Sequence, residues 1–149
     1  MTLSAQDLAE LQQLANRYWA LADLTEDFAL ADLFLPDALF ELGTLALKGL
    51  PAIEDFFSRR AEGMRESGRT TRHLACNFLA LPQAEGRVRV RSTVLVYAAE
   101  GELPLTAEAP SGIADFEDLC QRGPDDRWFY HSRAARTVFI GPTAASFAR

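Results

Sequence analysis

The chain has 149 residues, a length that allows one domain with a substantial core and is short for two. Apolar residues make up 48% and charged residues 24%, as in globular proteins. The net charge of −6 argues against a nucleic-acid partner, since phosphate binding needs a basic surface. No apolar segment approaches the roughly 18 residues of a membrane span, and no signal-peptide pattern is present. We therefore expect a single cytoplasmic domain over residues 1–149 without a membrane partner.

The first predicted element is an amphipathic helix that ends near Asp23. Ser4 followed three residues later by Asp7 resembles a capping box, and apolar residues then recur at spacings of three and four. Tyr18 lies on this apolar stripe, where a tyrosine is most often part of the core. Asp23 has an equally ordinary interpretation, because an aspartate at this point can cap a following helix.

The middle of the chain predicts two further helices and a pair of strands. A short helix is expected from Thr25 to just before Pro36, since acidic residues favour a helix start and helices end before proline. Residues 38–43 and 45–49 then predict two strands joined by a turn. Residues 51–64 predict a helix with proline in its first turn.

The second half predicts four long strands, over residues 70–81, 87–98, 112–121 and 127–139. The segment between the second and third of these strands is longer and contains prolines, so we expect a mobile loop over an opening. Helices first and long antiparallel strands later predict an α+β fold in which helices cover one face of a curved sheet. Such a fold can enclose a pocket for a small, mostly apolar molecule.

One strand face carries the polar residues that interest us most. A period of two places His73, Asn77 and Leu79 on the same face. An imidazole in a pocket needs a partner that holds its tautomer, and Asp23 is our candidate. The alternative is a histidine that simply forms hydrogen bonds in the core. Asn77 is a candidate substrate contact, as is Arg136, although a surface salt bridge is the more ordinary role for that arginine.

Other chemistries find no motif in the chain. There is no HExxH, no cluster of histidine and cysteine, no glycine-rich phosphate loop and no GxSxG. We therefore expect neither a metal nor a cofactor.

Four stretches of the sequence resemble the SnoaL-like branch of the nuclear transport factor 2-like (NTF2-like) superfamily. The resemblance covers nearly the whole chain and implies a cone in which N-terminal helices pack on a curved antiparallel or mixed sheet around a pocket. The stretches are RYWALADLTEDFALADLFLPDALFELG, KGLPAIEDFFSRR, TRHLACNF and DDRWFYHSRAAR.

Within that superfamily, the site residues are most similar to those of bile acid dehydratases. The pattern is a tyrosine and an aspartate on the first helix with a histidine on the first long strand, here Tyr18, Asp23 and His73. Dehydrochlorinases of chlorinated cyclohexanes have a lysine where Tyr18 stands. Ketosteroid isomerases use an aspartate at the position of Leu42, which speaks against their mechanism.

The resemblance implies a cofactor-independent lyase or isomerase, dehydratase-like or cyclase-like, that acts on an apolar polycyclic, steroid-like or aromatic molecule. His73 would be the general base, because an ordinary imidazole is mostly neutral at cytoplasmic pH. Asp23 would hold the imidazole, and Tyr18 would donate a hydrogen bond to a substrate carbonyl or departing hydroxyl. Trp19 and Phe56 would add apolar lining.

The alternative function is non-catalytic. The chain could bind a small molecule without changing it, or serve as a subunit resembling the β subunit of ring-hydroxylating dioxygenases. In either case we expect a homo-oligomer, a dimer or trimer, because soluble proteins commonly form symmetric assemblies.

Overall fold

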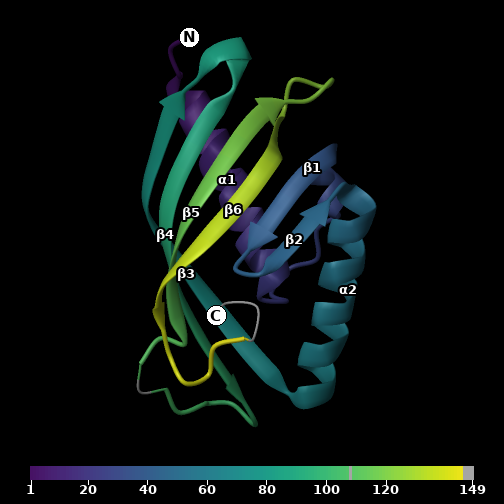
Figure 1. Ribbon diagram of the computed structural model, residues 1–149, viewed down its shortest axis with the longest axis vertical. Helices are drawn as coiled ribbons and strands as arrows, with labels where there is room; N and C mark the ends of the chain where they lie inside the picture. The colour runs from purple at the N-terminus through teal and green to yellow at the C-terminus, as the bar shows by residue number, and fades with distance from the viewer. Residues whose placement is uncertain (108, 146–149) are drawn as a thin grey trace.

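The computed structural model describes residues 1–107 and 109–145, and Figure 1 shows two helices packed against a strongly curved sheet. No helix of the described residues is long and apolar enough to cross a membrane. The elements in chain order are α1 (Ala5–Ala22), η1 (Leu30–Asp32), β1 (Phe34–Leu42), β2 (Leu45–Lys48), α2 (Leu50–Ser67), β3 (Arg69–Pro82), η2 (Ala84–Gly86), β4 (Val88–Glu100), β5 (Gly112–Arg122) and β6 (Trp128–Ile140).

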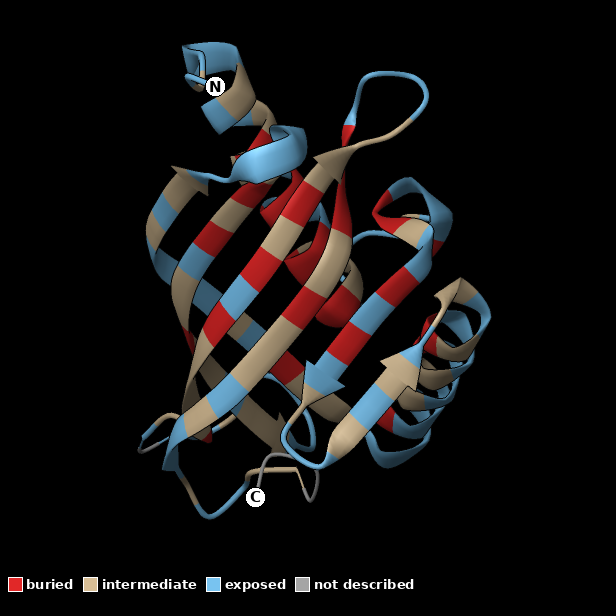
Figure 2. Cartoon of the chain, turned by 45° about the horizontal axis from the view of Figure 1, so that its top comes forward, coloured by how far each residue is buried: buried red, intermediate tan, exposed pale blue. Residues whose placement is uncertain are grey.

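The sheet has six strands in the order β2-β1-β6-β5-β4-β3. β1 and β6 run parallel and every other neighbouring pair is antiparallel, so the sheet is mixed. Buried residues recur at every second position in the second half of β5 (Figure 2), as expected for a strand with one face on the core. The predicted α+β fold, with helices on a curved mixed sheet around a pocket, is confirmed.

The predicted second helix is wrong. The chain forms only the single 3₁₀ turn η1 there and enters β1 at Phe34, before the proline. Leu33 and Phe34 are both fully buried, and the Leu33 carbonyl accepts from the Tyr130 backbone N–H at 2.8 Å. The chain thus gains packing and strand pairing at the point where a helix would have to continue toward the proline. Pro36 is tolerated because the pairing of β1 with β6 is interrupted between Phe34 and Leu39.

A bulge in β3 changes which residues face the core. Between Cys76 and Leu79, β3 has one residue more than β4, and Asn77 adopts a φ of 55°. As a result Phe78 packs against the core, whereas Leu79 is 49% exposed. The simple period of two that placed Asn77 and Leu79 on the face of His73 therefore stops at the bulge.

A second bulge, in β6 at His131, buries an ion pair. The extra residue turns both Tyr130 and Arg133 toward the core. Arg133 is 1% exposed and its Nη1 donates to Oδ2 of Asp118 at 2.9 Å. Burial raises the pKa of Asp118 to about 6, and the charge of Arg133 opposes this shift. The guanidinium carbon of Arg133 also lies 4.0 Å from the ring centre of Tyr18, so the ion pair packs against the C-terminal end of α1.

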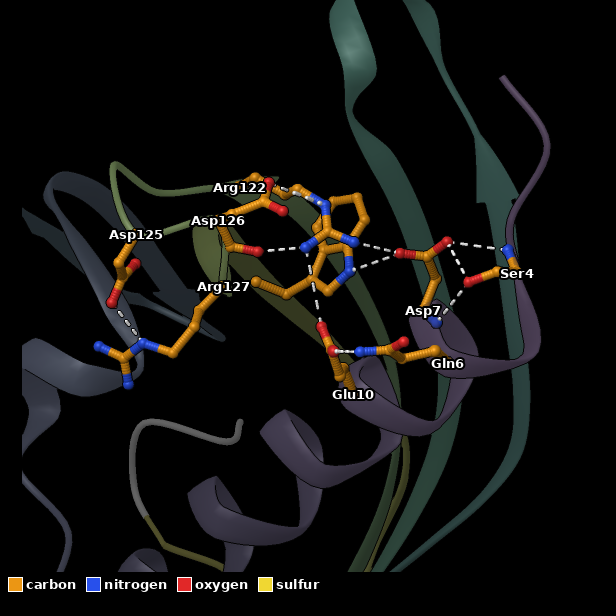
Figure 3. Close-up of polar contacts among 9 residues, drawn as sticks. Ser4, Gln6, Asp7, Glu10, Arg122, Asp125, Asp126 and Arg127 are labelled. Atoms are coloured by element: carbon orange, nitrogen blue, oxygen red, sulfur yellow. Dashed lines mark hydrogen bonds and ion pairs between the residues drawn. The ribbon is translucent and has the colours of Figure 1, made fainter.

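The start of α1 is tied to the far end of the sheet by Asp7 (Figure 3). Its Oδ2 accepts from the Ser4 backbone N–H at 2.8 Å, and the Asp7 N–H donates to the Ser4 hydroxyl at 3.0 Å, so the predicted capping box is confirmed. The other carboxylate oxygen accepts from Trp128 Nε1 at 3.2 Å and contacts Arg122. One side chain thus joins α1 to β5 and β6.

Asp7→Asn is expected to lower the free energy of unfolding at pH 7 by about 1 kcal/mol, because it weakens the cap and the contact with Arg122. Hydrogen bonds from Ser4 hold the pKa of Asp7 at about 2, so this stability is present above about pH 4 and lost as the pH falls toward 2. Urea unfolding followed by circular dichroism measures both effects. Asp37→Asn, on an exposed position of β1, is the control. An acid-induced loss of stability equal in D7N and wild type would contradict the assignment.

Arg133→Met is expected to destabilise the fold by about 3–5 kcal/mol, because it leaves the Asp118 carboxylate buried without its partner. The double variant D118L/R133M removes both charges and should regain most of that stability. Thermal and urea unfolding of wild type, single and double variants measure the difference. If the double variant were no more stable than R133M, the packing of the arginine, not its charge, would be the stabilising factor.

Candidate active site

A cavity of about 310 Å³ lies between the two helices and the concave face of the sheet. The C-terminal half of α1, the middle of α2, β1 and the four long strands all contribute to its wall. Ser111, near the end of the predicted loop over residues 100–112, also lines the cavity. The mobility of that loop stays a prediction. Most of the lining is apolar and much of it aromatic, and it includes Trp19, Phe40, Phe56, Phe57, Val94 and Phe116.

Asp23 lies at the end of α1, just behind the residues that line this cavity. It is the C-terminal cap residue of the helix, and its backbone N–H donates to the Trp19 carbonyl at 2.9 Å. Its carboxylate accepts from the Thr71 hydroxyl and from the His73 backbone N–H, both at 2.8 Å. The carboxylate therefore bonds to β3 and does not cap a second helix, so the ordinary interpretation of Asp23 is wrong.

The imidazole of His73 faces the same carboxylate. Its Nδ1 lies 2.6 Å from Oδ1 of Asp23, and the ring stacks on Trp19 with centroids 4.5 Å apart and planes 22° apart. A carboxylate only accepts hydrogen bonds, so Nδ1 carries the proton in the neutral ring. His73 lines the cavity, and its Nε2 forms no hydrogen bond with any described residue. That nitrogen is available to accept a proton.

The charge state of Asp23 supports this tautomer. Although burial raises the pKa of Asp23, the hydrogen bonds and charge of His73 and the hydrogen bond from Thr71 outweigh it and hold the pKa below its usual range. Asp23 is therefore ionised at neutral pH. An ionised carboxylate against Nδ1 orients the ring and stabilises the imidazolium that forms when Nε2 takes a proton.

Tyr18 lies on the same wall, 3% exposed, with its ring edge-on to Trp19 and Phe57. Burial raises the pKa of Tyr18, against the opposing charges of Arg133 and Arg60. The phenol therefore keeps its proton and can donate a hydrogen bond. The cavity thus brings together an oriented imidazole and a hydroxyl donor.

The predicted substrate contacts divide into two groups. Trp19 and Phe56 line the cavity as expected. Asn77 and Arg136 do not: Asn77 is exposed at the β3 bulge, and Arg136 is exposed on β6, opposite Asp115. The other histidine of the chain, His131, lies at the β6 bulge outside the cavity lining.

Sequence reasoning missed several polar residues of the lining, among them Arg60, Arg69 and Thr71. Two signals could have found them. Arg60 follows Phe56 by four residues and so shares its helix face, and Arg69 and Thr71 precede His73 at a period of two. Over residues 1–107 and 109–145 there is no group of three His, Cys, Asp or Glu side chains that could hold a metal ion.

Known proteins share this architecture. Three solved structures are similar: ActVI-ORFA from Streptomyces coelicolor (TM-score 0.77, 16% identity, 93% of this chain and 100% of that one); a scytalone dehydratase-like protein from Novosphingobium aromaticivorans (0.74, 22%, 93% and 89%); and a Catenulispora acidiphila protein in complex with S-DNPA (0.69, 22%, 90% and 95%). At these identities the likeness shows the NTF2-like cone fold alone.

Sequence comparison assigns the family. No curated protein sequence matches the chain significantly. The model of the SnoaL-like domain matches residues 4–134, which include Tyr18, Asp23 and His73. Because this match covers most of the chain, the protein belongs to the SnoaL-like domain family.

Proposed function

We propose that the protein is a cofactor-independent lyase or isomerase, of the dehydratase or cyclase type, in which His73 is the general base. The observation that carries the proposal is the contact of 2.6 Å between Nδ1 and the Asp23 carboxylate, made by a ring that also lines an apolar cavity. Membership of the SnoaL-like family is consistent with it. The closer likeness to bile acid dehydratases stays a prediction.

The chemistry begins with a proton on a carbon next to a carbonyl group. Nε2 of His73 takes that proton, the electron pair moves to the carbonyl oxygen, and Asp23 stabilises the imidazolium. Tyr18 donates a hydrogen bond to the developing negative charge on oxygen. The electron pair then returns from the oxygen. Either a carbon–carbon double bond forms as a hydroxyl departs from the β-carbon, and the imidazolium protonates that hydroxyl so that it leaves as water, or the imidazolium gives its proton to the far carbon of a conjugated enolate. The first outcome is a dehydration and the second an isomerisation.

The cavity suggests the kind of substrate. Its volume of about 310 Å³ is at the lower end of the range for ligand pockets, and its walls present the faces and edges of several aromatic rings. These properties favour a compact aromatic or polycyclic molecule. Binding alone would not require an ionised carboxylate that orients an imidazole, so the dyad favours catalysis over a non-catalytic binding protein or a dioxygenase-type subunit.

The proposal is tested by hydrogen–deuterium exchange in D₂O with 2-tetralone, a bicyclic aromatic ketone whose C1 protons lie next to the carbonyl. The wild-type protein should accelerate exchange at C1, as measured by NMR. His73→Ala should reduce the accelerated rate by about 10²–10⁴-fold, because the base is lost. Asp23→Asn should also reduce it strongly, since the amide can donate to Nδ1 and so favours the tautomer whose Nε2 cannot accept a proton.

The matched control is His131→Ala, which removes the other histidine of the chain and should leave the rate unchanged. Circular dichroism verifies that each variant is folded. Exchange that is as fast in a folded H73A variant as in wild type would contradict the role of His73. A wild-type protein that binds 2-tetralone without accelerating exchange would instead favour the binding hypothesis.

A further inference from the structure

The polar groups of the cavity wall carry positive charge, although the chain as a whole has a net charge of −6. The ionisable side chains in the lining are Tyr18, Arg60, Arg69 and His73, and among the described residues no aspartate or glutamate belongs to it. Asp23 lies behind the histidine. A small molecule in this cavity therefore meets two permanent cations and no anion of the protein.

Arg60 points from α2 toward the end of α1 and is half-buried. Its Nη1 donates to the backbone carbonyl of Ala22. Within the described part of the chain no carboxylate pairs with this guanidinium, whereas that of its neighbour Arg59 pairs with Asp55. A guanidinium has several N–H donors in one plane, so one contact to a carbonyl leaves donors free for a ligand.

Arg69 is the second cation, at the first position of β3 and just after Gly68, which ends α2. Its Nη2 donates to the Thr143 carbonyl at 3.1 Å, and it too has no carboxylate partner among residues 1–107 and 109–145. Burial lowers the pKa of Arg60 and the charge of Arg69 lowers it further, against the opposing effects of Tyr18 and Asp23. The two arginines are thus close enough to repel each other.

Two unpaired cations beside an apolar cavity are unfavourable until an anion joins them. A carboxylate suits them because it accepts two parallel N–H bonds from one guanidinium, and charged hydrogen bonds are stronger than neutral ones. Arg69, Thr71 and His73 lie at alternate positions of β3, which spaces the first and last Cα atoms by about 13 Å. Arg69 and the imidazole of His73 are thus separated along β3, whereas Arg60 donates to the residue that precedes Asp23 and so lies nearer the imidazole.

We propose that the molecule acted on by His73 carries a carboxylate, which Arg60 and Arg69 bind while the ring system lies against the aromatic wall. That His73 acts chemically on this molecule rests on the proposed function. That the molecule carries a negative charge is inferred from the two arginines in the cavity lining. The inference assigns to these two residues the substrate contact that the sequence had suggested for Arg136.

The test compares 2-naphthoate with 2-naphthamide, which have the same ring system but differ in charge, by isothermal titration calorimetry at neutral pH and low salt. Wild type should bind the naphthoate at least about tenfold more tightly than the amide. Arg60→Gln and Arg69→Gln should each reduce this preference by about tenfold or abolish it, with little effect on the amide. Arg59→Gln, one residue away on α2, should leave the preference intact.

Arg60→Lys keeps the charge and should retain part of the preference, which separates loss of the cation from any loss of folding. Equal binding of the two probes by wild type, no binding of naphthoate below about 1 mM, or an unchanged preference in R60Q and R69Q would each overturn the inference.

His73→Ala separates this inference from the proposed function, because it should abolish exchange on 2-tetralone while it keeps the naphthoate preference. A preference without His73-dependent exchange would leave the anion site standing and remove the base. Exchange without the preference would remove the anion site alone.

Discussion

The site depends on the bonds that the carboxylate of Asp23 makes to β3. This carboxylate receives hydrogen bonds from the Thr71 hydroxyl and the His73 backbone, and it contacts the His73 ring. The same side chain therefore fixes the end of α1 against β3 and orients the imidazole. At the other end of the helix, about 24 Å away, Asp7 joins the cap to β5 and β6. Two carboxylates thus hold α1 across the sheet, and of the two only that of Asp23 bonds to residues that line the cavity.

The contacts between α1 and the buried Arg133 explain why the position of the His73 imidazole can be rigid. The guanidinium of Arg133 lies 4.0 Å from the ring centre of Tyr18 and 4.9 Å from that of Trp19, and Trp19 in turn stacks on His73. Asp118 balances the buried charge. A chain of contacts therefore runs from the buried ion pair through two aromatic rings to the imidazole. Burial of such a pair is costly, and its orientation of the aromatic rings is a benefit that an apolar pair would not give.

Periodic spacing predicted the secondary structure well: the apolar stripe of α1 follows from spacings of three and four, and the long strands follow from a period of two. The pairing of Asp23 with His73 was predicted differently, from the need of an imidazole for a partner and from the family resemblance. Bulges are different, because one inserted residue shifts every later side chain to the other face. Because of the bulge at Asn77, Leu79 does not face the pocket. Because of the bulge at His131, a period of two does not reveal that Arg133 faces the core. Cytoplasmic location and oligomeric state stay predictions.

The residues missed at the site show how a single strand can supply several functions. Before its bulge, β3 keeps a strict period of two, and this directs Arg69, Thr71 and His73 into the same cavity. Thr71 lies between Arg69 and His73 on the strand, and its hydroxyl donates to Asp23. Thr71 therefore links the orientation of the His73 imidazole to the position of Arg69. Because the strand is paired with β4 throughout this stretch, the spacing between the His73 imidazole and the Arg69 guanidinium is set by backbone geometry and not by a loop. A rigid spacing of this kind favours one length of molecule over others, which a pocket built on a flexible loop could not do as strictly.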